Sequence, residues 1–125
     1  ERLARERGLN GRAEFTGRID EAELASLYAR CLAVYYAPVD EDFGMVPYEA
    51  FLSGKPVLTT TDAGGPLEIV TDGRTGRVTA PEPGALAAAA GFLSANPAEA
   101  ESYGRAGREL AAKVTWDGCI DRLLA

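Results

Sequence analysis

The chain has 125 residues, of which 46% are hydrophobic and 26% charged, a size and composition that fit one globular domain with its own core. Its 13 basic and 19 acidic residues give a formal net charge of −6 and form no basic stripe, which argues against a nucleic-acid duplex or an anionic membrane surface as a partner. No apolar run approaches the roughly 18 residues needed to cross a bilayer, and the absence of histidine excludes a Ser-His or Cys-His triad within this chain.

Helical and extended patterns alternate along the sequence. The charged residues 1–7 are typical of the end of a helix that Gly8 stops, and since the chain lacks an initiator Met we expect it to be a piece of a longer protein. The further predicted elements are a strand at 13–16, a helix at 20–30, a strand at 32–37, a helix at 47–53, a strand at 56–61, a short helix at 66–70, a strand at 77–79, and helices at 83–95, at 97–113 and from 115 onward.

This alternation predicts an α/β fold: a partial Rossmann-like, doubly wound parallel sheet of about four strands with helices on both faces. Ligands of such sheets bind beyond the carboxyl ends of the strands. The loops at 40–46 and 62–66 both follow predicted strands and both contain glycine, so their side of the sheet is the candidate site. Gly64 and Gly65 either shape the neighbouring loop or only form a tight turn.

Two carboxylates flank the start of the predicted helix at 47–53. Glu41 lies in the preceding loop and Glu49 in the helix, with seven residues between them. Pro47 suits the first helical position, which leaves the amides of residues 44–46 free at the helix N-terminus, where the dipole favours an anion such as a diphosphate. Glu41 is then placed to accept hydrogen bonds from sugar hydroxyls, and Glu49 from the two hydroxyls of a ribose.

A second interpretation gives these carboxylates no ligand. Glu49 would stabilise the N-terminus of its own helix, and Glu41 would be one of three solvated acids in a loop. The spacing alone does not separate the two interpretations.

A longer collinear pattern favours the first. It comprises PVDEDFGMVPYEAFLSGKPV at 38–57, GGPLEIV at 64–70 and DGRTG at 72–76, flanked by FTG at 15–17 and TWD at 115–117. From residue 13 to 125 this series strongly resembles the C-terminal, donor-binding domain of the family-4 (group 1) glycosyltransferases, retaining enzymes of the GT-B fold that use nucleotide sugars.

The resemblance implies a role for each residue of the loop and helix start. Glu41 would contact the donor sugar near the reacting anomeric carbon and be the catalytic position. The backbone amides would bind the donor, those of Phe43 and Gly44 at the sugar and those of Met45 and Val46 at the diphosphate.

The resemblance also places the nucleoside. Glu49 would bind the ribose, and Arg18 and Ile19 would lie near the base. No metal ion or other cofactor is expected, since the nucleotide sugar is itself the substrate.

The sequence departs from the family pattern in what it lacks. The family's domain begins with two further strands, with an Arg and a Lys that neutralise the diphosphate, and it follows an acceptor domain that usually carries a catalytic His. Near the motif this chain offers only Lys55 and Arg18. We therefore expect residues 1–125 to be a truncated donor-binding domain that does not turn over substrate alone. A non-catalytic nucleotide-binding or scaffold module, and a nucleotide-sugar epimerase, remain as alternative functions.

Two further expectations concern pairing and location. The two absent strands would lie between the predicted strands at 13–16 and 32–37, so either these two pair directly, which we favour, or a second copy pairs with the open edge and forms a homo-oligomer. Cys31 and Cys119 have no CxxC spacing and no histidine partner, which fits buried thiols in a reducing compartment and argues against a metal site. We expect a soluble, cytoplasmic protein.

Overall fold

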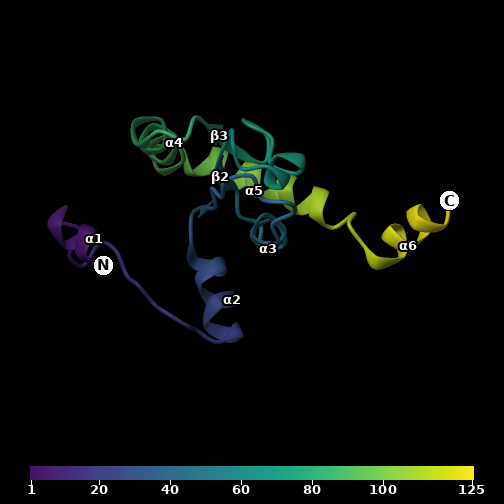
Figure 1. The fold of residues 1–125 in the computed structure, drawn as a ribbon, viewed down its shortest axis with the longest axis horizontal. Coiled ribbons are helices and arrows are strands. Elements are labelled where there is room, and N and C mark those ends of the chain that lie inside the picture. The colour runs from purple at the N-terminus through teal and green to yellow at the C-terminus, as the bar shows by residue number, and fades with distance from the viewer.

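The computed structural model describes residues 1–125, and its centre is a parallel sheet of three strands in the order β1-β2-β3 (Figure 1). The middle strand, β2 (Val57–Thr60), has all four side chains buried. It pairs with β1 (Val34–Tyr35) on one side and with β3 (Gly76–Thr79) on the other. A short apolar run that is covered on both faces is the pattern that predicted this strand.

Helical segments surround the sheet. Their bounds are α1 (Arg2–Glu6), α2 (Glu21–Arg30), α3 (Val46–Leu52), the 3-10 helix η1 (Gly65–Glu68), α4 (Pro83–Ala95), α5 (Pro97–Ala111) and α6 (Trp116–Leu124). The predicted helix at 83–95 agrees with α4 at both ends, and α2, α3 and α5 agree with their predictions to within two residues. Asp20 caps α2 as expected, because its side chain accepts a hydrogen bond from the amide of Glu23.

Both faces of the sheet are covered by helices. Successive side chains of β2 point to opposite sides, so they join two different buried clusters. Val57 joins a buried cluster with Phe51 of α3 and with residues 69, 70 and 111. The next residue, Leu58, joins a second buried cluster with Leu93 of α4 and Tyr103 of α5. The predicted α/β architecture with helices on both faces is confirmed, with three strands in place of four.

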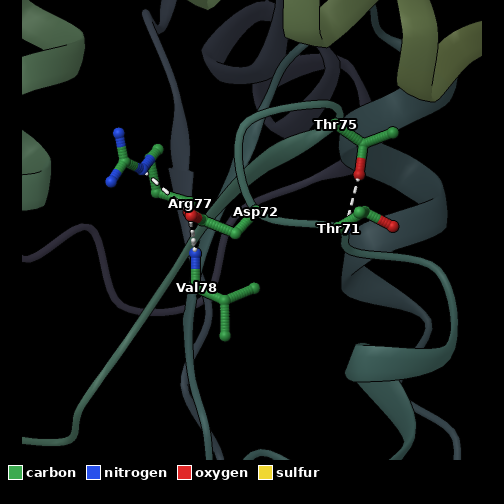
Figure 2. A network of polar contacts seen from close by, with 5 residues as sticks. All are labelled: Thr71, Asp72, Thr75, Arg77 and Val78. Carbon is green, nitrogen blue, oxygen red and sulfur yellow. Dashed lines mark hydrogen bonds and ion pairs between the residues drawn. The ribbon is translucent and has the colours of Figure 1, made fainter.

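The network before β3 fixes the amino-terminal edge of the sheet. The Asp72 carboxylate accepts a hydrogen bond from the amide of Val78 at 3.0 Å and pairs with Nε of Arg77 at 2.9 Å (Figure 2). Thr75 Oγ1 accepts a hydrogen bond from the amide of Thr71 at 2.8 Å. Gly76 follows directly, paired with the first residue of β2. The DGRTG pattern therefore organises the edge opposite to the candidate site, and its role here is structural.

The expected pairing between residues 13–16 and the strand at 32–37 is wrong. Residues 13–17 have no regular structure, Phe15 is 57% exposed, and the chain between α1 and α2 runs apart from the sheet (Figure 1). β1 has only two residues and a single neighbour, β2. α2 is long enough to connect two adjacent parallel strands, but its length alone does not make residues 13–16 pair with β1. This segment has only two apolar residues, so pairing would bury too little surface to offset the entropy lost on ordering it.

The C-terminal helix α6 extends away from the rest of the molecule (Figure 1). It contributes no buried residue, and Trp116 at its start is 84% exposed. Cys119 is exposed on this helix and Cys31 is half-buried, both as free thiols. The expectation of buried thiols is therefore wrong for Cys119, because the apolar face of its helix has no partner within this chain. No helix is long and apolar enough to span a membrane.

The helix α5 approaches α3 so closely that two positions of α5 have no room for a side chain. A Cβ atom at Gly104 would overlap the carbonyl oxygen of Gly54, and one at Gly107 would overlap the ring of Phe51. These glycines let the α5 backbone lie directly on the end of α3, and α5 contributes to both buried clusters. Small residues at this contact therefore join the two layers of the fold.

We predict that Gly104→Ala lowers the free energy of unfolding by at least about 2 kcal/mol, because the added methyl group meets backbone that cannot move aside. Gly91→Ala is the matched control. Gly91 lies within α4 with no atom near its missing Cβ, so this substitution should raise the free energy of unfolding by about 0.5–1 kcal/mol. Urea denaturation of the purified chain measures both values, and equal shifts would contradict the packing described here.

Candidate functional site

The loops that follow β1 and β2 are joined by backbone hydrogen bonds. The amide of Asp40 donates to the carbonyl of Asp62 at 2.9 Å and the amide of Glu41 to that of Ala63 at 3.1 Å. The Gly65 amide donates back to the carbonyl of Glu41 at 2.6 Å. The two strand-to-helix loops therefore form one surface at the carboxyl ends of the strands, at the edge that the sequence predicted.

Gly64 and Gly65 allow this close approach of the two loops. A Cβ at Gly64 would lie 2.6 Å from the carbonyl oxygen of Glu41 and 2.8 Å from its nitrogen. A Cβ at Gly65 would overlap the carbonyl of Asp42. Gly64 also has a φ of 76°, in the left-handed region that favours glycine. Both roles left open by the sequence are thus present: the glycines make a turn, and they shape the loop that carries Glu41.

Three consecutive backbone amides are unpaired at the start of α3. The amides of Gly44, Met45 and Val46 donate no hydrogen bond within the protein, and no side chain caps the helix. Gly44 has a φ of 71°, and a Cβ there would lie 3.1 Å from the ring of Tyr36 and 3.2 Å from Cγ of Pro66. The prediction of free amides at this edge is confirmed, although α3 begins at Val46, so that the proline occupies its second position.

Glu41 is held by a tyrosine that the sequence analysis did not select. The hydroxyl of Tyr36, one residue beyond β1, donates a hydrogen bond to Oε2 of Glu41 at 3.2 Å. Burial of the phenol and the nearby negative charge of Glu41 raise the pKa of Tyr36. Tyr36 therefore stays a hydrogen-bond donor at neutral pH, and Glu41 keeps its second oxygen free.

Glu49 lies one turn into α3 and contacts a different helix. The hydroxyl of Tyr28 in α2 donates a hydrogen bond to Oε2 of Glu49 at 2.8 Å. Glu49 makes no side-chain hydrogen bond to the amides of α3. Its place in the first turn of α3 still fits the alternative interpretation, in which this carboxylate stabilises its own helix N-terminus through the helix dipole.

The two residues expected near a base directly precede α2. Arg18 is exposed and Ile19 half-buried, just before α2, and neither makes a hydrogen bond or ion pair with the loop at 41–46. The chain enters α2 at the end of the helix farther from the sheet (Figure 1). The structure thus brings the loop residues and Glu49 together around the start of α3, and it shows no polar contact from Arg18 or Ile19 to them.

The side chains of the loop form an apolar border beside the free amides. The ring of Phe43 stacks on Tyr48, with centroids 5.1 Å apart and an interplanar angle of 12°. Phe43 and Met45 are about half exposed, and they line an open depression between α3 and α6 together with Leu52. The side chains of Phe43 and Met45 therefore lie at this depression, and their backbone amides remain unpaired.

Sequence reasoning missed Tyr28 and Tyr36. Each donates to one of the two glutamates, and the two tyrosines are eight residues apart, as are Glu41 and Glu49. This matched spacing is visible in the sequence, but it connects a helix and a strand end to a loop and a second helix. No helical or strand period would have paired them, so the contacts became visible only in three dimensions.

Comparisons with known proteins identify the family of the chain. The chain belongs to the family of group 1 glycosyl transferases, whose model matches residues 1–110. It is 35% identical to the alpha-1,3/1,6-mannosyltransferase ALG2 of Dictyostelium discoideum, over 85% of this chain and 25% of that protein. It is 40% identical to a glycogen synthase of Mycobacterium tuberculosis, over 76% of this chain and 23% of that protein.

Solved structures show the same fold. A sucrose-phosphate synthase from Thermosynechococcus elongatus has a TM-score of 0.82 at 33% identity, over 98% of this chain and 32% of that one. Alr3699/HepE of Anabaena, in complex with UDP, has a TM-score of 0.81 at 30% identity, over 98% of this chain and 34% of that one. The predicted family and its GT-B fold are confirmed, and the chain spans about a quarter to a third of the length of these relatives.

The contact between Tyr28 and Glu49 should affect how the stability of the fold depends on alkaline pH. Burial and the hydrogen bond to Glu49 raise the pKa of Tyr28 above the value near 10 of a free tyrosine. A raised folded-state pKa means that the contact stabilises the fold fully below pH of about 10, and that this contribution is lost as the pH rises through the folded-state pKa.

We therefore expect Glu49→Gln to move the appearance of the Tyr28 phenolate to lower pH, because the substitution removes the negative charge beside the phenol. Ultraviolet absorbance titration measures this, with Tyr28→Phe identifying the signal. Glu82→Gln, at an exposed glutamate before α4, is the control that should leave it in place. Identical titrations of the two glutamate variants would show that Tyr28 and Glu49 are not in contact.

Proposed function

We propose that the protein containing this chain is a retaining glycosyltransferase, which transfers a sugar from a nucleotide-diphosphate sugar to an acceptor. This chain would contribute the donor site. The observation that carries the proposal is the set of three unpaired amides at residues 44–46, beside Glu41 and at the carboxyl edge of the sheet. Family membership supports it, as does the presence of UDP or UDP-glucose in the HepE structures.

The diphosphate would bind to the amides of Met45 and Val46, and the sugar to those of Phe43 and Gly44. Backbone N–H groups at a helix start are pre-oriented donors for phosphate oxygens, and the helix dipole favours the negative charge. The amide of Phe43 is also without a partner, so all four donors are available. The absence of a Cβ at Gly44 lets this loop pack against Tyr36 and Pro66, which holds the row of amides in place.

Glu41 would act on the reacting carbon as a charged and positioning group. Positive charge develops on the sugar ring as the bond to the diphosphate breaks, and a carboxylate fixed nearby stabilises that charge. The hydrogen bond from Tyr36 fixes its orientation before substrate arrives. The departing diphosphate itself would assist deprotonation of the acceptor hydroxyl, and no metal ion or other cofactor is part of the proposal.

Glu49 would accept hydrogen bonds from the ribose, which completes the pair of glutamates with seven residues between them. The assignment of Arg18 and Ile19 to the base pocket rests on the family resemblance alone. Cationic partners for the diphosphate would come from parts of the protein outside this chain, because Lys55 lies beyond the far end of α3.

The remaining parts of the proposal concern the whole protein. Residues 1–125 would be a truncated donor-binding domain, completed by its first strands and by an acceptor domain. The open edge of β1 supports pairing with another segment, in the same protein or in a homo-oligomer. The free thiols of Cys31 and Cys119 fit a cytoplasmic location.

The isolated chain should bind a nucleoside diphosphate with a dissociation constant on the order of millimolar, since backbone donors act without cationic partners. Glu49→Ala should weaken this binding further, and Glu82→Ala should not. Isothermal titration calorimetry measures all three. Micromolar affinity that Glu49→Ala leaves unchanged would contradict the assignment of Glu49 to the ribose.

In the intact enzyme, Glu41→Gln should lower kcat by at least about a hundredfold, a loss of roughly 2.7 kcal/mol of transition-state stabilisation, with nucleotide binding nearly intact. The amide is close in shape to the carboxylate but lacks its charge. Asp42→Asn, at the exposed acid next in the chain, is the control and should keep kcat near that of the unmodified enzyme. Similar kcat values for the two variants would show that Glu41 has no catalytic role.

A further inference from the structure

Tyr28 connects two helices that meet at few other points. α2 contributes no buried residue, yet the ring of Tyr28 packs against the buried cluster around Phe51 and Val57. From this half-buried position its hydroxyl reaches Oε2 of Glu49 at 2.8 Å. This is the one hydrogen bond between α2 and α3, and its acceptor is a glutamate that we assign to the ligand.

We propose that Tyr28 is a positioning residue for ribose recognition: it holds Oε2 of Glu49, so that Oε1 is presented to the ribose hydroxyls. The inference rests on the proposed function, because it deepens the role given there to Glu49.

The chemistry of the pair supports this role. An ionised carboxylate accepts hydrogen bonds at both oxygens and donates none, so a phenol at one oxygen leaves the other available to a diol. A glutamate on a helix surface loses side-chain entropy when a ligand fixes it. Where a hydrogen bond has fixed it beforehand, the ligand no longer bears that cost.

The phenol remains a donor under the conditions of catalysis. Burial and the adjacent carboxylate raise the pKa of Tyr28, so its hydroxyl keeps its proton at neutral pH. The same arrangement occurs at the other glutamate, where the Tyr36 hydroxyl donates to Oε2 of Glu41 at 3.2 Å. Each of the two glutamates thus has one oxygen bound to a tyrosine and one free.

A purely structural role would have a different signature. If Tyr28 only attached α2 to the domain, loss of its hydroxyl would lower stability and weaken every ligand alike. If it orients Glu49, the loss depends on whether the ligand has ribose hydroxyls. Ligands with and without these hydroxyls therefore separate the two roles.

The test uses Tyr28→Phe in the intact protein, which keeps the packed ring and removes only the donor. The probe is whichever of UDP, GDP and ADP binds tightest, together with its 2′,3′-dideoxy counterpart. We expect Tyr28→Phe to weaken the ribonucleotide by about fivefold, as for one hydrogen bond that acts indirectly, and to leave the dideoxy affinity within about twofold. With donor sugar, KM should rise more than kcat falls.

Tyr35→Phe is the matched control, since Tyr35 is 61% exposed, lies on β1 and makes no side-chain hydrogen bond. It should change neither affinity. An equal loss for ribo- and dideoxynucleotide in Tyr28→Phe, or no loss for either, would overturn the inference. If Glu49→Ala also fails to distinguish the two nucleotides, the ribose role of Glu49 itself is wrong. If Glu49→Ala distinguishes them and Tyr28→Phe does not, only the inference about Tyr28 fails.

Discussion

The contact on which the site depends is the direct approach of two loop backbones, residues 41–43 against residues 64–65. Side chains at Gly64 or Gly65 would occupy the space of the Glu41 and Asp42 backbone, so this contact exists only with glycine at both positions. It fixes the height of Glu41 above the sheet and the direction in which the chain enters α3. The free amides and both carboxylates therefore depend for their positions on a contact between backbones, in which neither carboxylate takes part.

The proposed function of this edge therefore depends on backbone geometry more than on reactive side chains. A chain without histidine still presents unpaired amides at a helix start, which supply donors and partial positive charge for the diphosphate of the proposed function. The carboxylates add direction, and a phenol holds each of them. This arrangement suits the proposed reaction, in which a charged leaving group departs from a sugar and the protein would contribute orientation and electrostatic stabilisation.

The sequence predicted those parts whose cause is local. Pro83 and the alanine-rich run after it define α4, Asp20 caps α2, and Gly44 with Pro47 marks the free helix start. It failed where the cause is a partner distant in the chain. Residues 13–16 have a strand-like pattern but no neighbour to pair with, and Tyr28 meets Glu49 only because α2 packs against the core cluster. Periodicity describes which face is apolar, and it does not say which hydroxyl lies opposite which carboxylate.

The shared membership of α5 in both buried clusters has a consequence for motion. Because Gly104 and Gly107 place its backbone on the end of α3, neither helix is able to slide or rotate without moving the other, and α4 follows through the second cluster. The sheet and these three helices are therefore joined into one packed unit. α1, α2 and α6 contribute no buried residue, so less buried surface attaches them to this unit. Any closure over a bound donor would then pivot at the borders of this unit, with the start of α3 carried along unchanged.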